Sequence, residues 1–169
     1  DLNARRDGSS RFGSANQFHN FWSAGGAWIF SEERFIKDHL PFLSYGKLRG
    51  SYGTTGNDQI GDYRYLSLYN PTSASNPYQG ATGLVPNNLT NPYLEWEETR
   101  KLQFGINLGF LKDRVLFDVD YFRNRSSNQL IGYSLPFLTG FSSITQNFPA
   151  VVQNNGWEFA LSTENIKNG

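Results

Sequence analysis

Two stretches of regular alternation constrain the fold of this chain more than any other feature. In Leu102–Phe110 every second residue is apolar, and the residues between them are polar or glycine. The alternation resumes in Val115–Tyr121, after the short polar segment Leu111–Arg114. A period of two gives a β-strand one apolar face and one polar face, whereas a helix would scatter the same residues around its axis. The pattern therefore predicts a β-hairpin.

Weaker alternation predicts further strands on both sides of this hairpin. The segments are Leu2–Arg6, Trp22–Phe30, Lys47–Thr55, Leu130–Leu135 and Gly156–Thr163. The segment Leu130–Leu135 is expected to continue the second arm of the hairpin. Between two of the strands, Ser31–Ser44 has room for one helical turn. The sequence thus predicts an all-β fold with about six visible antiparallel strands.

The connections between the predicted strands are very unequal in length. Gly56–Leu94 is rich in Asn, Tyr, Pro, Gly and Ser, and its Asn-Pro dipeptides are typical of turns and extended loops. A loop of that length inside a compact domain is normally functional or disordered. In contrast, Leu111–Arg114 leaves space only for a tight turn.

Composition excludes several classes of function. The chain has 15 basic and 15 acidic residues, no cysteine, and two histidines, His19 and His39. The balanced charge lacks the basic patch that nucleic-acid binding needs, and the sequence offers no histidine- or cysteine-built metal site. Asp118 and Asp120 share one strand face, but a solvated polar face explains them better than acid–base catalysis. We therefore expect no enzyme activity and no cofactor.

Two architectures fit strands with one apolar and one polar face. A soluble or surface-exposed β-sandwich would bury the apolar face under a second sheet, and its tyrosine-rich loop would bind carbohydrate. A transmembrane barrel would turn that face to lipid, with short turns on one side, long loops on the other, and aromatic residues at both interfaces. Aromatic residues are expected near the strand ends at Trp28, Phe30, Tyr52, Trp96, Tyr121, Phe122 and Trp157. The strand and loop lengths favour the barrel.

Six short motifs in order carry a family resemblance across nearly the whole chain. They are Arg6–Gly13 (RDGSSRFG), Trp28 with Ser31–Glu33 (SEE), Leu48–Asn57 (LRGSYGTTGN), Asn91–Glu97 (NPYLEWE), Asp118–Phe122 (DVDYF) and Asn155–Glu158 (NGWE). In these motifs the chain resembles SusC/RagA-type TonB-dependent transporters of the Bacteroidetes outer membrane, in the later part of their β-barrel. It departs from the family at Pro149 and Ala150, where glycine and an acidic residue are expected, so regular strand geometry is in question there.

This resemblance implies a fold, a location and a set of partners. Residues 1–169 would be part of one β-barrel domain, roughly a quarter of a 22-stranded wall, lying in the lipid bilayer of the outer membrane as a multi-pass barrel. The whole protein would import glycans or peptides. Its partners would be a SusD-like surface lipoprotein and TonB, the latter contacted by a part of the protein not in this chain. The plug domain is likewise absent from this chain.

The long loop holds the candidate ligand contacts. They are Tyr63, Tyr65, Tyr69 and Tyr78. A tyrosine ring offers a flat apolar surface with a hydroxyl group at its edge, which suits a sugar ring or a peptide segment. The alternative is that these rings pack the loop upon itself.

The barrel interpretation predicts on which side of the membrane the loops lie and how the chain behaves when expressed alone. Leu111–Arg114 is expected on the periplasmic side and Gly56–Leu94 outside the cell, because barrels place short turns inside and long loops outside. The chain opens in strand-like sequence and stops at the turn-like Ile166–Gly169. Alone it would leave unpaired strand edges and bare apolar faces, so we expect it to aggregate without further barrel strands.

Overall fold

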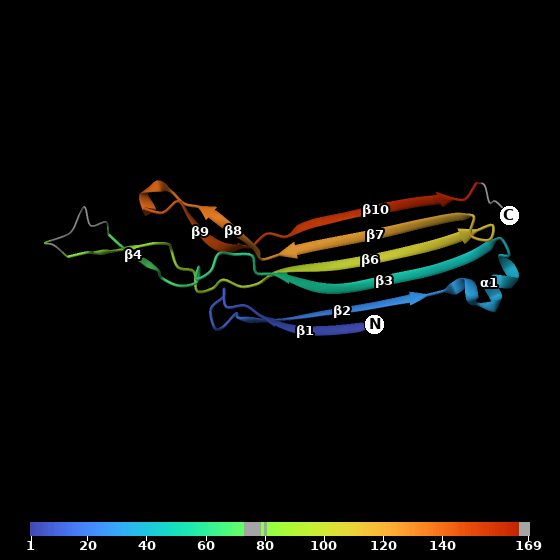
Figure 1. Cartoon of the computed structure of the whole chain (residues 1–169), viewed down its shortest axis with the longest axis horizontal. Helices are drawn as coiled ribbons and strands as arrows, with labels where there is room; N and C mark the ends of the chain where they lie inside the picture. The colour runs from blue at the N-terminus through green and yellow to red at the C-terminus, as the bar shows by residue number, and fades with distance from the viewer. Residues whose placement is uncertain (73–78, 80, 166–169) are drawn as a thin grey trace.

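The chain forms one long antiparallel sheet with smaller structures at both ends (Figure 1). The computed structural model describes residues 1–72, 79 and 81–165, so that Tyr78 and Ile166–Gly169 lie outside the described residues. The six-stranded sheet has the order β1-β2-β3-β6-β7-β10. Its strands are β1 (Leu2–Gly8), β2 (Phe18–Trp28), β3 (Leu43–Asn57), β6 (Glu97–Phe110), β7 (Val115–Ser127) and β10 (Val152–Thr163).

The predicted central hairpin is confirmed. β6 and β7 pair in continuous antiparallel register from Phe110 opposite Val115 to Glu98 opposite Ser127. The turn between them, Leu111–Arg114, has positive φ angles at Leu111, Lys112 and Asp113. The Ser44 hydroxyl stabilises this turn, since it accepts a hydrogen bond from the Asp113 N–H at 2.9 Å and lies 2.8 Å from the Asp113 carboxylate.

The strands extend further than the alternation predicts. β6 begins at Glu97, whereas the pattern begins at Leu102, and β3 continues to Asn57. These extensions lie at the end of the sheet that carries the long loops, which we call the loop end. Both faces of the sheet are polar there, and no hydrophobic period marks the strand. Pairing with neighbours on both sides keeps β6 extended there, because every backbone group finds a ladder partner.

The loop end carries two small sheets of its own. One joins β4 (Tyr69–Pro71) to β5 (Leu84–Pro86), and the other joins β8 (Gln129–Ser134) to β9 (Ser143–Phe148). β9 was not predicted, and the expectation that Leu130–Leu135 continues the second hairpin arm was wrong. Asn128 adopts a φ of 56°, which ends β7 and turns the chain into a separate hairpin. β9 in turn ends at Phe148, directly before Pro149.

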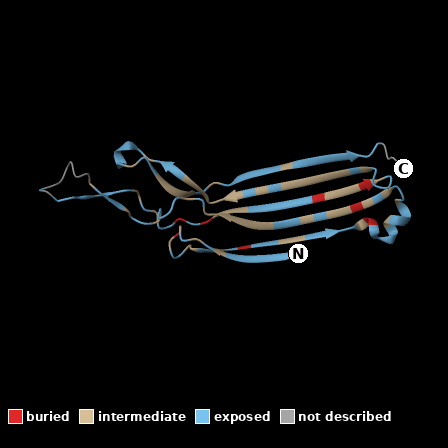
Figure 2. Cartoon of the chain, viewed as in Figure 1, coloured by how far each residue is buried: buried red, intermediate tan, exposed pale blue. Residues whose placement is uncertain are grey.

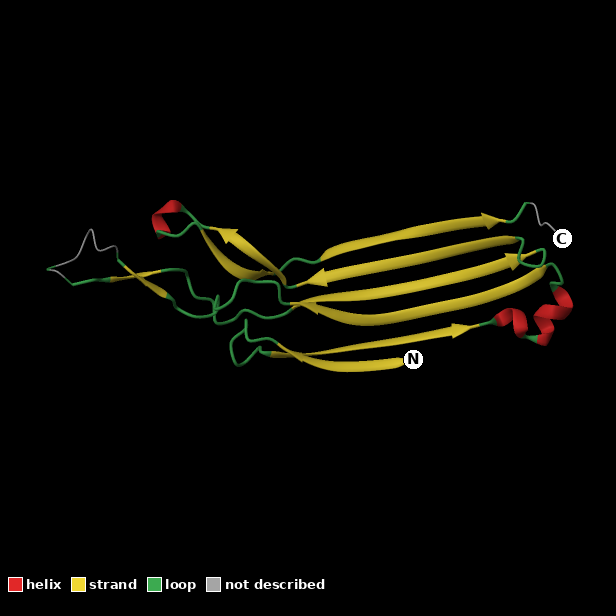
Figure 3. Cartoon of the chain, in the orientation of Figure 1, coloured by secondary structure: helices red, strands yellow, loops and turns green. Residues whose placement is uncertain are grey.

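Short helices lie at the opposite end of the sheet, beside the tight turn Leu111–Arg114, and at the tip of one loop (Figure 3). We call the end with the tight turn the turn end. The segment η1 (Phe30–Glu32) precedes α1 (Arg34–His39), and α1 lies within Ser31–Ser44, where one helical turn was predicted. A second single turn, η2 (Phe137–Thr139), caps the β8–β9 hairpin. The described residues include no helix long and apolar enough to cross a membrane.

The hydrophobic core is small and does not lie under the sheet. Its buried hydrophobic residues are Phe12, Phe21, Leu94 and Trp96, all at the loop end. Along the strands, residues of both faces remain accessible (Figure 2). Phe104 is 51% exposed and Phe159 is 67% exposed. The sandwich alternative requires a second sheet over the apolar face. In the part of the chain that the structure describes, no such sheet covers it.

Candidate functional site

The register assigns every residue of the six strands to one of two faces. Residues directly opposite each other in an antiparallel pair point to the same side of the sheet. Ile106 lies opposite Leu48 and Val119, and Val119 lies opposite Phe159. We call this side the apolar face. Its other large members include Leu2, Trp22, Trp28, Tyr52, Leu102, Phe104, Leu108, Phe110, Phe117, Tyr121, Trp157 and Leu161.

Aromatic pairs lie at both ends of the apolar face. At the loop side the pairs are Trp22 with Tyr52, at 5.4 Å between ring centroids, and Tyr121 with Trp157, at 5.0 Å. At the turn side they are Trp28 with Phe30 and Phe42 with Phe110, at 6.0 and 6.3 Å. Eight residue steps along β6, at about 3.4 Å each and a tilt near 40°, separate these levels by roughly 21 Å. That height is close to the apolar band of an outer-membrane barrel.

Two of the aromatic residues predicted near strand ends do not belong to these pairs. Trp96 is buried at the loop end, and Phe122 points to the opposite, polar face. Tyr52, Tyr121 and Trp157 lie within their strands, because the strands run on past the apolar band toward the loops. Alternation alone does not show where along a strand the apolar face ends.

The polar face carries a chain of charged and amide side chains. Arg49 on β3 reaches across β6 to Asp120 on β7, with its Nη2 2.6 Å from Oδ1. It passes over Gly105, where an added Cβ would lie 2.2 Å from that carboxylate oxygen. Asn107 donates to Asp118 at 2.5 Å. The two aspartates share this face as predicted, and each has its own partner, so they line the face as structural groups.

A groove follows the polar face along β3, β6 and β7. Among its lining residues are Lys47, Arg49, Gln103, Asp120, Asn124 and Glu158. These side chains include two cationic, two anionic and two amide groups, which bring many hydrogen-bonding groups to one surface. Such a surface suits water or a polar protein segment, whereas the apolar face does not. The sheet therefore has one polar face and one hydrophobic face.

An aromatic cluster anchors the loops to the end of the sheet. Trp96 packs against Phe12 at 5.3 Å and against the edge of Phe21 at 5.7 Å between centroids, and Leu94 is fully buried beside them. Gly56, near the end of β3, makes this approach possible, because a Cβ there would lie 2.1 Å from the Phe21 ring. We call this group, Phe12, Phe21, Leu94 and Trp96, the loop anchor.

Polar contacts tie three loop segments to one another around the loop anchor. Arg11 of the first loop donates to Asp62 of the long loop at 3.0 Å. Asn91 of the long loop donates to the Thr145 carbonyl on β9 at 3.0 Å. The backbone N–H of Glu95 donates to the Asn147 side chain, also at 3.0 Å. The loops thus form one connected surface.

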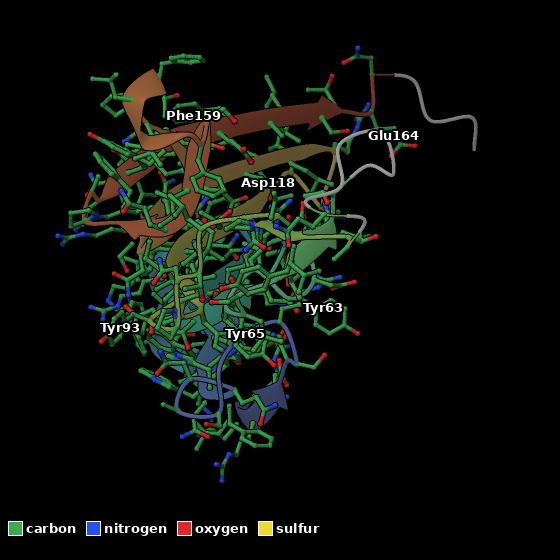
Figure 4. The ribbon with its side chains drawn as sticks, turned by 90° about the vertical axis from the view of Figure 1, so that its left-hand side faces the viewer. Tyr63, Tyr65, Tyr93, Asp118, Phe159 and Glu164 are labelled. Atoms are coloured by element: carbon green, nitrogen blue, oxygen red, sulfur yellow. The ribbon has the colours of Figure 1, made fainter. Side chains whose placement is uncertain are left out.

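The predicted tyrosines occupy different positions on this surface. Tyr65 packs against the loop anchor, which supports the packing alternative for that residue. Tyr63, with a φ of 61°, and Tyr69, on β4, are each 57% exposed. Tyr78 lies outside the described residues. Viewed from the loop end, Tyr63 and the 83% exposed Tyr93 lie on opposite sides, with Tyr65 between them (Figure 4). Sequence reasoning used Tyr93 only within a family motif and missed its exposure.

The acidic residues around Trp96 do not form a shared site. Glu95 accepts a hydrogen bond from Asn128 at 2.9 Å, and Glu97 accepts one from Asn57 at 3.2 Å. Glu98 faces the other way and contacts Arg100 at 2.7 Å. Among the described residues there is no group of three or more His, Cys, Asp or Glu side chains that could hold a metal ion.

Comparison with known proteins assigns this two-faced sheet to a family. The profile of the family described as "TonB dependent receptor-like, beta-barrel" matches residues 1–166. The chain belongs to this receptor family. Among curated members, TonB-dependent receptor P39 of Formosa agariphila is 40% identical over 164 residues, which cover 97% of this chain and 15% of the receptor. SusC of Bacteroides thetaiotaomicron is 35% identical over 96% of this chain and 16% of its own length.

Solved structures of the receptor family share the fold. The RagAB peptide importer in its closed-closed state matches with a TM-score of 0.87 at 32% identity, covering 99% of this chain and 18% of the matched chain. A second RagAB structure, in the open-open state, matches with a TM-score of 0.81 at 34% identity, covering 95% of this chain and 17% of that one. The chain therefore spans less than a fifth of the length of these relatives, and its antiparallel sheet corresponds to part of their barrels.

Proposed function

We propose that the chain forms part of the barrel wall of a TonB-dependent importer in the outer membrane, with residues 1–169 belonging to one barrel domain. The apolar face, bounded by aromatic pairs at both ends, carries this proposal. It would lie against the hydrocarbon of the bilayer, and the polar face would line the lumen. β1 and β10 would pair with further strands of the protein, since unpaired edges are costly in lipid. The aggregation of the isolated chain stays a prediction on the same grounds.

Cargo and partners follow from the relatives. The RagAB structures are described as a peptide importer, and SusC is a TonB-dependent receptor. We infer that the whole protein imports a peptide or glycan, works with a SusD-like surface lipoprotein, and contacts TonB through a part outside this chain. The family consists of receptors and transporters, and we assign the chain no catalytic role. The connected loop surface would meet the incoming nutrient.

The exposed loop tyrosines provide the test of cargo contact. We expect the Tyr63→Ala/Tyr69→Ala double variant of the full-length transporter to take up cargo less efficiently, since each lost ring contact is worth about 0.5–1.5 kcal/mol. The half-saturating cargo concentration should rise roughly twofold to twelvefold per ring in contact. Uptake by cells that rely on this transporter, given peptides or oligosaccharides as sole nutrient, is the measurement. Tyr65→Phe is the control, because it keeps the packed ring. Unchanged uptake in the double variant would remove these tyrosines from the site.

The topology can be tested independently of cargo. Single cysteines at Asp113, in the tight turn, and at Leu138, which is 97% exposed at the tip of the β8–β9 hairpin, introduce the only thiols in this chain. On intact cells a membrane-impermeant maleimide should label Leu138→Cys strongly and Asp113→Cys only after the outer membrane is permeabilised. Equal labelling at both positions would contradict the proposed orientation.

A further inference from the structure

The loop-side edge of the apolar face carries a row of arginines. We call a strand position outward when its side chain points to the same side of the sheet as the apolar face. Beyond the level of Tyr52, Tyr121 and Trp157, the outward positions include Arg6 on β1, Arg100 on β6, and Arg123 and Arg125 on β7. We call these four residues the arginine row. In the described strands, the outward positions between the two levels of aromatic pairs hold no charged residue. The charge therefore begins where the apolar face ends.

Two members of the arginine row face each other directly. Arg100 lies opposite Arg125 in the β6–β7 ladder, and Arg123 is one outward position further along β7. Directly opposed like charges destabilise a pair of strands. Glu98 is the one carboxylate at an outward position of the six strands, and it contacts both Arg100 and His19. The remaining strand carboxylates point to the polar face, so the row has an excess of positive charge on this side.

Neighbouring side chains hold two of the guanidinium groups in place. Arg123 donates through Nε to Gln153 of β10 at 3.1 Å, and Gln153 in turn donates to Asn155 at 3.3 Å. The Arg6 guanidinium lies over the Phe18 ring, 4.8 Å from its centroid. Arg123 and Arg125 are both exposed and keep donors free for an external ligand, since each guanidinium carries five N–H groups.

We propose that the arginine row binds the phosphate of a lipid headgroup in the outer leaflet, an inference that rests on the proposed placement of the apolar face in the membrane. Aromatic residues of a barrel mark the headgroup level. A phosphate there would lie beside Arg100, Arg123 and Arg125 while its acyl chains cover the apolar face below. Arginine binds phosphate through paired, charge-assisted hydrogen bonds, and the anion would relieve the repulsion between Arg100 and Arg125.

The test uses the full-length transporter in neutral detergent, with phosphatidic acid as the probe and diacylglycerol as its match without phosphate. Native mass spectrometry counts bound lipid, and thermal unfolding reports stabilisation. We expect the unmodified protein to bind and be stabilised by phosphatidic acid but not by diacylglycerol. In Arg100→Gln/Arg125→Gln, phosphatidic acid binding should weaken about tenfold or more, the usual effect of losing charged hydrogen bonds.

A control on the polar face separates a site from general charge attraction. Lys47→Gln/Lys101→Gln removes the same charge from inward-pointing positions, Lys101 being next to Arg100 in β6, and should bind phosphatidic acid like the unmodified protein. Equal losses in the two double variants, or no loss in the arginine variant, would overturn the proposal. Full competition by inorganic phosphate at the concentration of the lipid would overturn the lipid assignment.

A single variant covers the case in which the double variant fails to assemble. Arg125→Gln removes one of two opposed charges, so without anionic lipid the thermal unfolding midpoint should not fall. The increase in midpoint that phosphatidic acid causes should become smaller. A lower midpoint without lipid, together with an undiminished increase on adding phosphatidic acid, would contradict the proposal. Separation of inner and outer membranes from the same cells tests the proposed location by itself. Lipid binding to purified protein and membrane location can therefore fail independently.

Discussion

Replacing Ile106 by arginine is expected to cripple assembly of the full-length transporter into the outer membrane. Ile106 lies at the centre of the apolar face, between Leu48 and Val119. An arginine at the lipid-facing midplane of a barrel costs about 2–4 kcal/mol, and the cost falls toward the interfaces. The amount of folded transporter in outer-membrane fractions, read from its heat-dependent mobility on gels, is the measurement.

The next residue supplies the matched control. Asn107 points to the polar face, where it donates to Asp118. Asn107→Arg places the same charge one residue away but on the hydrated side, next to a carboxylate, and should leave membrane assembly near normal. A reversed result, with Asn107→Arg more damaging, would mean that the register is wrong by one residue, since such a slip moves every side chain to the other face.

Truncating Trp96 is expected to release the loops while leaving the barrel intact. Trp96 is 8% exposed and packs against Phe12 and Phe21. Phe or Trp to Ala changes in a core cost roughly 3–5 kcal/mol. Because proteolysis of a transiently open segment follows its open population, 3 kcal/mol corresponds to an approximately hundredfold faster cleavage of the loops. Limited proteolysis of the full-length transporter in membranes measures this rate.

Tyr93→Ala is the control for this experiment, because it removes a large ring from the same loop without opening the loop anchor. Tyr93 is 83% exposed. Its removal should leave the cleavage rate unchanged. If Trp96→Ala loops were cut no faster than Tyr93→Ala loops, the loop anchor would not hold the loop surface together. If the strands themselves became sensitive, the cluster would stabilise the barrel rather than the loops.

Alternation predicts the strands wherever one face is apolar and fails where both faces are polar. β6 carries a period of two from Leu102 to Phe110, and β7 carries one from Val115 to Tyr121 with Leu116 as its single exception, so the hairpin could be derived from the sequence. Their loop-side extensions and β9 carry no such period, and only pairing with a neighbouring strand keeps them extended. The turn at Asn128 depends on one left-handed residue, which the pattern does not mark.

The loop surface was less predictable than the sheet. Tyrosines in Gly56–Leu94 were identified by chemistry, but burial of Tyr65 depends on contacts with the loop anchor, whose members come from three separate segments. The exposure of Tyr93 and the opposed pair Arg100 and Arg125 likewise depend on register and on contacts between distant segments. Composition suggested which residue types could bind cargo, and only the fold showed which of them remain accessible.

The apolar face is proposed to lie against lipid, and the polar face is proposed to line a hydrated lumen. Nitroxide labels placed one at a time at positions 102–110 of the full-length transporter in bilayers test this placement directly, by collisions with oxygen, which partitions into lipid, and with a water-soluble nickel complex. We predict a period of two, with even-numbered positions accessible to oxygen and odd-numbered positions shielded from it. Low oxygen accessibility at Phe104, Ile106 and Leu108 would contradict this placement, because these side chains would then be buried in protein.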